Sequence, residues 1–220
     1  MIDAVVDAVA QRLPADSPPL VVGIAGGVGV GKTTLAGQLA TALTAAPQGA
    51  SVAVVSTDNF LLPNVDLDRL GLAMRKGFPE SYDEARLVAA VASLRAGGVS
   101  SIPVYDHDRY DVLDSLVDVE PTDVLVLEGV NALQPAIAAI LDVSFYLDAD
   151  EDTAEAWFHE RFRERCESGI GFYAPLHAMS EEQRTAIADG AWRGINVVNL
   201  REHITPTRER ADYVLRARDA

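Results

Sequence analysis

The sequence has one cysteine, few basic residues and no long apolar run. Cys166 is the only cysteine among the 220 residues, so no disulfide can form within the chain, and a reducing compartment is expected. Lysine and arginine number 18 against 33 acidic residues, which gives a formal net charge of -15. A surface with this charge repels nucleic-acid backbones and anionic lipid, so we expect no nucleic-acid or membrane partner. The longest nearly apolar run, residues 19–31, is too short and too rich in glycine to span a bilayer.

The first ten residues carry aspartate where a signal peptide would carry lysine or arginine, so a cytoplasmic protein is expected. The hydrophobic content of 49% is too high for a disordered chain. The length suits one well-packed domain, and no repeat or low-complexity linker divides it. We therefore predict a single domain over residues 1–220.

Five apolar runs of strand length punctuate the chain, at residues 20–25, 51–56, 123–128, 143–148 and 212–216. Most lack polar alternation, which is typical of strands buried on both faces of a parallel sheet. Helical patterns fill the intervals, and Ser81 with Glu84 and Ser180 with Gln183 are predicted capping boxes. The second of these helices is expected to reach about residue 200. The alternation of strands and helices predicts a doubly wound α/β domain with a mostly parallel sheet.

A phosphate-binding loop is predicted directly after the first strand. Residues 26–33 read G-G-V-G-V-G-K-T and match G-x-x-x-x-G-K-[ST], with a helical pattern following. Backbone N–H groups of such a loop wrap a polyphosphate, and the helix N-terminus adds partial positive charge. Lys32 would bridge the β- and γ-phosphates, and the Thr33 hydroxyl would bind Mg²⁺. The predicted ATP-binding residues are Gly26, Gly27, Val28, Gly29, Val30, Gly31, Lys32, Thr33 and Thr34.

Two carboxylates stand at the ends of predicted strands, where a doubly wound sheet binds its ligands. Glu128 follows four apolar residues, as a Walker B acid does, and is a predicted Mg²⁺ ligand. Asp58 lies just beyond the strand at 51–56 and could accept the proton of an attacking hydroxyl. The alternative is that each acid caps a turn or helix. The neighbouring phosphate loop favours the catalytic interpretation.

Residues 150–166 form an acidic-to-basic helical segment. Acids fill its first turn and arginines its last, as the helix dipole favours. Arg161 and Arg165 lack an acid four residues before them and are therefore expected to be unpaired, and Phe158 falls on the same helical face. Such arginines are typical of a lid that closes over a transferring phosphate, and the lid region would cover about residues 150–180. A solvated surface network is the alternative.

Seven segments occur in the order found in one kinase family, and they span about residues 20–216. They are G-x-x-x-x-G-K-T, T-D-N-F-L-L-P-N, R-K-G-F-P-E-S-Y-D, P-V-Y-D-H-D-R-Y-D, V-L-V-L-E-G-V-N-A-L, R-G-I-N-V-V-N-L and P-T-R-E-R-A-D. The chain thus resembles the bacterial type I pantothenate kinases, a branch of the phosphoribulokinase/uridine kinase family of P-loop kinases. The resemblance implies a P-loop fold with a helical lid, and by family analogy a homodimer.

The resemblance also implies roles for individual residues. Asp58 would be the base facing the acceptor hydroxyl, Glu128 a magnesium ligand and Arg161 a lid arginine that stabilises the transferring phosphate. The residues implied to line the acceptor pocket are Tyr105, His107, Tyr110, Phe158 and Asn196, with Asp58 and Arg161. Tyrosine and histidine donate and accept hydrogen bonds with little charge, which suits a polyhydroxylated or amide-bearing acceptor. For His107 taken alone, an ordinary surface position in an acidic loop is the alternative.

Several positions depart from the family pattern. Phe158 stands where the family has a pocket tyrosine, and the lid loop 169–179 is shorter. Gly37 and Arg165 replace residues tied to feedback binding of coenzyme A, so that inhibition is not expected. A hydrogen-bonding pocket that loses a partner can change its preferred substrate.

The sequence therefore predicts an ATP- and Mg²⁺-dependent kinase that phosphorylates a hydroxyl of a small metabolite, with Asp58, Lys32 and Arg161 as catalytic residues. Pantothenate is the leading acceptor by resemblance, followed by a nucleoside or a sugar such as fructose. A nucleotide-hydrolysing switch or metallochaperone is the rival from another class. It would lack a use for the Tyr105–Tyr110 stretch.

Overall fold

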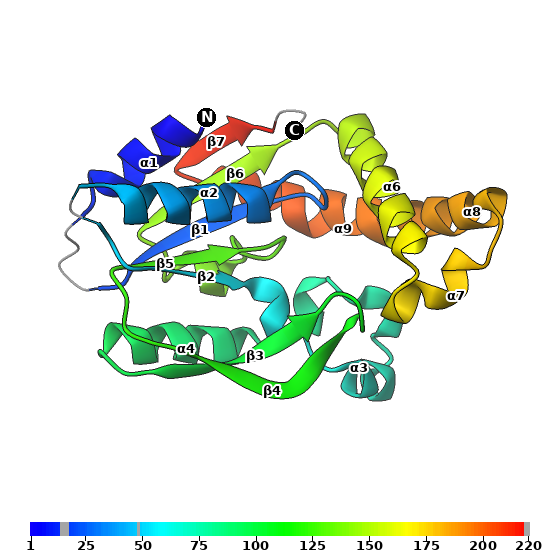
Figure 1. Cartoon of the computed structure of the whole chain (residues 1–220), viewed down its shortest axis with the longest axis horizontal. Helices are drawn as coiled ribbons and strands as arrows, with labels where there is room; N and C mark the ends of the chain where they lie inside the picture. Colours follow the sequence, from blue (N-terminus) through cyan, green and yellow to red (C-terminus); the bar gives the residue numbers. More distant parts are fainter. Residues whose placement is uncertain (14–17, 48, 218–220) are drawn as a thin grey trace.

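A five-stranded parallel sheet forms the centre of the computed structural model, which describes residues 1–13, 18–47 and 49–217 (Figure 1). The strand order is β2-β5-β1-β6-β7, and every neighbouring pair is parallel. The strands are β1 (Leu20–Gly26), β2 (Val52–Ser56), β5 (Val124–Glu128), β6 (Val143–Asp148) and β7 (Tyr213–Arg216). They match the five apolar runs to within a residue or so, and the predicted α/β fold is confirmed.

Helices lie on both sides of this sheet and extend beyond one end of it (Figure 1). They are α1 (Ile2–Ala10), α2 (Lys32–Ala45), α3 (Asn64–Leu70), α4 (Glu84–Arg95), α5 (Pro135–Ala138), α6 (Glu151–Ser168), α7 (Ala174–His177), α8 (Glu181–Ala191) and α9 (Val197–Asn199). The helical path from α8 continues past the predicted end near residue 200. It passes through π-helical turns at Trp192–Asn196 and Leu200–Ile204.

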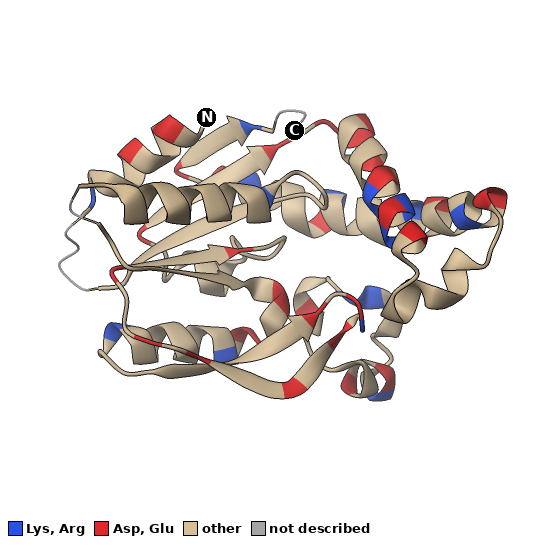
Figure 2. Cartoon of the chain, viewed as in Figure 1, with Lys and Arg blue, Asp and Glu red and all other residues tan. Residues whose placement is uncertain are grey.

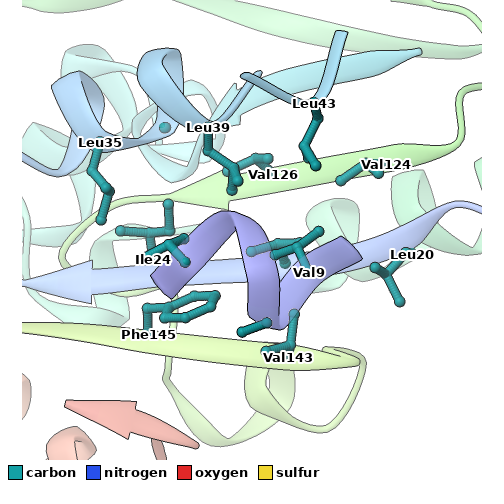
Figure 3. Packing of buried hydrophobic residues seen from close by; sticks show 14 of the residues in the cluster. Val9, Leu20, Ile24, Leu35, Leu39, Leu43, Val124, Val126, Val143 and Phe145 are labelled. Carbon is teal, nitrogen blue, oxygen red and sulfur yellow. The ribbon is translucent and has the colours of Figure 1, made fainter. Parts of the chain in front are cut away.

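Alternate residues of the central strands face two separate apolar layers. Val22 and Ile24 of β1 pack with α1 and α2. Figure 3 shows Ile24 in this layer with Val9, Leu39 and Phe145. Val21 of β1 and Leu125 and Leu127 of β5 face the opposite side of the sheet. There α4 and α5 contribute Leu87, Val91, Leu94 and Ile137. All seven residues of β1 are buried, which is the physical reason that its sequence shows no polar alternation.

A β-hairpin outside the main sheet was not predicted. β3 (Ser100–Asp106) pairs antiparallel with β4 (Asp111–Val119) and projects beside α4 (Figure 1). Its tip carries the D-H-D-R-Y segment, residues 106–110. The strand at 111–119 is mostly exposed, so its sequence carries little of the apolar signal that identified the buried strands.

One of the two predicted capping boxes is wrong. The helix at 84–95 begins after Asp83, whose carboxylate accepts the N–H of Arg86 at 2.9 Å. Ser81 is instead fully buried, and its hydroxyl donates to the Phe78 carbonyl at 2.7 Å. The other box is confirmed, because the Ser180 and Gln183 side chains each bond the other's backbone N–H. Local spacing could not distinguish Ser81 from Asp83 as the cap.

Charged side chains are scattered over the helices and loops, while the central strands are nearly free of them (Figure 2). The densest alternation of acidic and basic residues lies on α6, which leans away from the sheet. In the part of the chain that the structure describes, no helix combines the length and apolar character needed to cross a membrane.

Candidate active site

The phosphate loop joins β1 to α2 as predicted. Three of its glycines, Gly26, Gly29 and Gly31, have positive φ angles, and Gly31 with φ 90° is the N-cap of α2. A side chain would strain that left-handed turn, which places the loop amides at a helix N-terminus. The buried Lys32 ammonium donates to the Gly27 carbonyl at 2.6 Å. The Lys32 side chain therefore folds back over the phosphate loop.

Lys32 and two carboxylates form a charged group at the carboxyl ends of β1, β2 and β5. Burial lowers the pKa of Lys32, while the charges of Glu128 and Asp58 oppose that shift and the nearby Arg161 adds to it. Burial raises the pKa of Glu128, and the Lys32 charge opposes it. Thr33 donates its hydroxyl to Glu128 Oε1 at 3.1 Å. The tertiary structure thus brings the predicted phosphate, metal and base residues into one electrostatic unit.

The Thr33 hydroxyl and the Glu128 carboxylate suit Mg²⁺ by their chemistry. Mg²⁺ in phosphate-transfer sites takes one or two protein oxygens and completes its shell with phosphate and water. The described ranges hold no group of three or more His, Cys, Asp or Glu side chains placed to bind a metal. A two-ligand site beside a phosphate loop agrees with both observations.

Asp58 lies in the short turn Thr57–Phe60 that follows β2. Its carboxylate Oδ1 accepts the hydroxyl of Tyr82 at 2.9 Å, and its backbone N–H donates to Ser56 Oγ at 3.3 Å. Tyr82 is buried, and burial raises its pKa well above the usual value, so its hydroxyl remains a donor. Tyr82 was not predicted as a site residue, although it belongs to the R-K-G-F-P-E-S-Y-D segment. It orients the carboxylate.

A cavity of about 810 Å³ lies between the phosphate loop, the lid region and the hairpin tip. Its lining is Gly29, Val30, Gly31, Asp108, Trp157, Glu160, Arg161, Glu164, Arg165, Ser168 and Ile170. Arg161 thus faces the phosphate loop. Arg165, expected to be unpaired, donates from Nη1 to Asp108 Oδ1 at 2.8 Å, so that part of the arginine prediction is wrong. The partner comes from 57 residues away, beyond the reach of helical spacing.

An aromatic row runs from the hairpin to the lid region. Tyr105 lies edge-on to His107 at 5.1 Å between ring centroids and to Tyr110 at 6.4 Å. Tyr110 stacks on Phe172 at 4.8 Å, and Phe172 contacts Tyr173. Phe172 and Tyr173 were not predicted, because an exposed loop of mixed residues carries no periodic signal.

His107 is also close to the charged group. Burial lowers the pKa of His107, and the positive charges of Arg161 and Arg165 add to this while Asp58 opposes it. His107 is therefore mostly neutral at pH 7, as a hydrogen-bonding wall residue would be. The structure brings Tyr105, His107 and Tyr110 close to one another and to Asp58, although none of the four lines the cavity at Arg161.

Phe158 and Asn196 have different surroundings. Phe158 packs on Trp192 with ring centroids 5.6 Å apart and joins the apolar layer under the lid region. Asn196 lies in the π-helical turn, where its Nδ2 donates to the Ala191 carbonyl at 3.1 Å. Neither contact involves Tyr105, His107 or Tyr110. Their predicted place in the acceptor pocket stays a prediction.

Comparison with known sequences defines the family. The sequence model of the phosphoribulokinase/uridine kinase family matches residues 21–167, which is more than half of the chain. The chain belongs to this family. The matched range begins at β1 and ends within α6, so it includes the phosphate loop, Asp58, Glu128 and Arg161.

Individual relatives carry two different names. The chain is 41% identical over 215 residues to a pantothenate kinase from Rhizobium rhizogenes, covering 90% of this chain and 65% of that one. It is 39% identical over 216 residues to a pantothenate kinase from Vibrio vulnificus, covering 91% and 70%. The chain thus spans about two thirds of the length of these curated relatives. A crystal structure from Silicibacter sp. TM1040, provisionally assigned as a fructose transport system kinase, has TM-score 0.81 and 28% identity and covers 98% of both chains.

Proposed function

We propose that this protein is an ATP- and Mg²⁺-dependent kinase that phosphorylates a hydroxyl of a small metabolite, with pantothenate as the first acceptor to test. The observation that carries the proposal is the single cluster of Lys32, Thr33, Glu128 and Asp58 beside the Arg161 cavity. Family membership and 41% identity to a pantothenate kinase support it.

In this mechanism the loop amides and Lys32 hold the phosphates of ATP. Thr33 and Glu128 would hold Mg²⁺, which supplies neutralisation of phosphate charge when bound. Asp58 takes the proton as the acceptor oxygen attacks the γ-phosphorus. The bond from that phosphorus to the β-phosphate oxygen breaks, and ADP leaves. Arg161 stabilises the charge that spreads over the transferred group, and Tyr82 keeps the Asp58 carboxylate oriented.

The acceptor would lie against the row of Tyr105, His107 and Tyr110. These side chains offer hydroxyl, imidazole and aromatic faces and little net charge, which suits a neutral or singly charged molecule with hydroxyl or amide groups. The row ends in Phe172 of the lid region, so closure of the lid would exclude water from the acceptor.

A sugar such as fructose is the second candidate, and a specific observation favours it. The Silicibacter structure, provisionally assigned as a fructose transport system kinase, matches this chain with a TM-score of 0.81 over 98% of its residues. The higher sequence identity favours pantothenate. The two arguments point to different acceptors within the same chemistry.

The test is ADP release with ATP and Mg²⁺ and one acceptor at a time: pantothenate, fructose, uridine, cytidine, ribulose 5-phosphate, or none. Pantothenate is expected to stimulate turnover well above the rate without acceptor. Stimulation by fructose or a nucleoside alone would leave kinase chemistry in place and replace the acceptor. ATP hydrolysis that no acceptor accelerates would contradict the kinase proposal and favour the switch.

A further inference from the structure

Lysine is rare in this protein, and its two lysine residues lie near the candidate active site. Of the 18 basic residues only Lys32 and Lys76 are lysines, and the other 16 are arginines. Lys32 belongs to the phosphate loop. Lys76 follows the 3-10 turn Ala73–Arg75 and is half-buried, without a role in the mechanism above.

The Lys76 ammonium links three segments. It donates to Asn64 Oδ1 at 2.6 Å, at the start of α3, and to the backbone carbonyl of Tyr110 at the hairpin tip. It also lies 4.2 Å from the centroid of the Tyr110 ring and 5.0 Å from that of Tyr105. Cation–π attraction therefore adds to the two hydrogen bonds. The Lys76 side chain therefore contacts both Tyr105 and Tyr110, the two tyrosines predicted to line the acceptor pocket.

The backbone of Tyr110 explains why a clamp is needed. Its φ angle is 55°, and among the described residues it is the one non-glycine with positive φ. A bulky residue persists in this conformation only when its surroundings hold it there. The Tyr110 carbonyl also accepts Asn64 Nδ2 at 3.0 Å, and the Asn64 N–H donates to Asp111 Oδ1 at 2.9 Å. Two donors on one carbonyl thus hold the turn.

We propose that Lys76 is a positioning residue that sets acceptor affinity, by clamping the left-handed Tyr110 so that the rings of Tyr105 and Tyr110 face Asp58. This role rests on the proposed kinase function for its kinetic consequences and not for its structural ones. The acceptor class it serves is a small hydroxyl compound bound by aromatic faces.

The charge state of Lys76 gives the clamp a pH dependence. Burial lowers the pKa of Lys76 to about 8, while the facing carboxylates Asp111 and Asp58 oppose that shift. The other titratable groups facing it are the two tyrosines, whose pKa values are raised, to about 12 for Tyr110. Lys76 therefore loses its proton between pH 7 and 9 while both tyrosines stay neutral. The neutral amine loses the cation–π attraction and has weaker hydrogen bonds.

The kinetic test compares Lys76→Met with Lys76→Arg. Met keeps the apolar stem and is expected to raise the acceptor KM about tenfold or more, the loss of a charge-assisted bond, with the ATP KM within about twofold. Between pH 7 and 9 the acceptor KM of the natural protein should rise. That of Lys76→Arg should stay flat, because arginine keeps its charge. An acceptor KM unchanged in Lys76→Met would overturn the proposal.

Arg69→Met is the matched control. Arg69 is an exposed cation of α3 whose Nη1 bonds Asp66 at 3.1 Å, and it makes no part of the clamp. Its removal should leave the acceptor KM within about twofold. An equal rise in Arg69→Met would mean that Lys76 acts only through general charge, contrary to the proposal.

A second experiment needs no acceptor. Tyr110→Ala and Tyr110→Gly both lose the ring, but only glycine relieves the left-handed backbone, so their difference in Tm measures that strain. The Tm gap between the two should narrow when each is combined with Lys76→Met, because a turn that is no longer held can relax out of the left-handed conformation. An equal gap in both backgrounds would show that Lys76 does not hold the backbone.

Amine labelling separates failure of this inference from failure of the proposed function. With two lysines, modification by an amine-reactive reagent at graded pH can be read residue by residue by peptide mass spectrometry. Lys76 should react with a midpoint near 8, and a midpoint near the usual 10.5 would overturn the pH dependence. If no acceptor stimulates ADP release, the kinase proposal fails, and the Tm gap and labelling still decide the role of Lys76.

Discussion

Asp58 and Tyr82 form the smallest unit on which the proposed chemistry depends. The tyrosine hydroxyl fixes one carboxylate oxygen, and Ser56 fixes the backbone N–H of Asp58. A base held in this way does not need to be reoriented when the acceptor hydroxyl arrives. The residue scale is therefore where substitutions separate chemistry from binding.

Replacing Asp58 by asparagine should lower turnover at least about a hundredfold, because the amide cannot accept the hydroxyl proton. ATP affinity should change little, since the phosphates are held by the loop and Lys32. Steady-state ADP release and nucleotide titration measure the two effects. Asp66→Asn, at an exposed carboxylate of α3, is the control. Near-normal turnover in Asp58→Asn would remove Asp58 from the base role.

Arg161→Ala should lower turnover about a thousandfold and weaken ATP binding much less, because the guanidinium acts on charge that develops during transfer. Arg163→Ala is the matched control. It lies on the same helix, is exposed, and makes a long contact of 3.9 Å with Glu160. Equal small losses in both variants would return Arg161 to the surface-network interpretation.

At the scale of elements, the lid region and the hairpin meet at Asp108 as well as at the stacked rings of Tyr110 and Phe172. Asp108 at the hairpin tip accepts Arg165 through its side chain and the N–H of Phe172 through its carbonyl, at 2.7 Å. Gly171 allows this approach with φ 56°, because a Cβ there would lie 2.0 Å from the Asp108 carbonyl oxygen. The contact of Asp108 with the lid region therefore depends on residue 171 having no side chain.

Gly171→Ala should therefore loosen the lid from the hairpin. The strain of a left-handed alanine, about 1–2 kcal/mol, adds to the clash with backbone. We expect faster chymotryptic cleavage at Phe172 and Tyr173 and a higher acceptor KM. The Tm of the protein should be nearly unchanged, because the substitution lies outside the central sheet. Gly190→Ala is the control, since its Cβ would meet open space within α8. Unchanged cleavage in Gly171→Ala would mean that the loop adapts without opening.

At the scale of the whole molecule, the net charge of -15 opposes compactness. Acidic residues occur on helices and loops throughout Figure 2, and the 33 acids outnumber the 18 basic residues. Self-repulsion of this kind acts over a Debye length, about 30 Å at 0.01 M salt and about 8 Å at 0.15 M. Screening should stabilise the folded chain.

The Tm should accordingly rise between 10 and 150 mM KCl, measured by thermal unfolding at pH 7.5. Sodium chloride should act equally at equal ionic strength, because screening does not depend on the ion. A Tm that falls with salt would show that the surface ion pairs outweigh the repulsion. A rise confined to phosphate or sulfate would report anion binding at the phosphate loop instead.

Short contiguous segments of this sequence determined the fold class and, within the site, the phosphate loop, Asp58 and Glu128. Buried strands of a parallel sheet read as unbroken apolar runs, and a phosphate loop is contiguous, so both are visible without a structure. Asp58 and Glu128 were found because each directly follows such a run. These inferences needed no knowledge of which distant segments meet.

Only the tertiary structure decided the rest of the site. It joined Tyr82 to Asp58, Lys76 to Tyr110 and Arg165 to Asp108, pairs separated by 24, 34 and 57 residues. Lys76 and Tyr82 lie in the segment that carries the family resemblance, but their partners follow from folding alone. The physical reason is that a polar contact depends on where two backbones converge, whereas burial and loop geometry are encoded by neighbours along the chain.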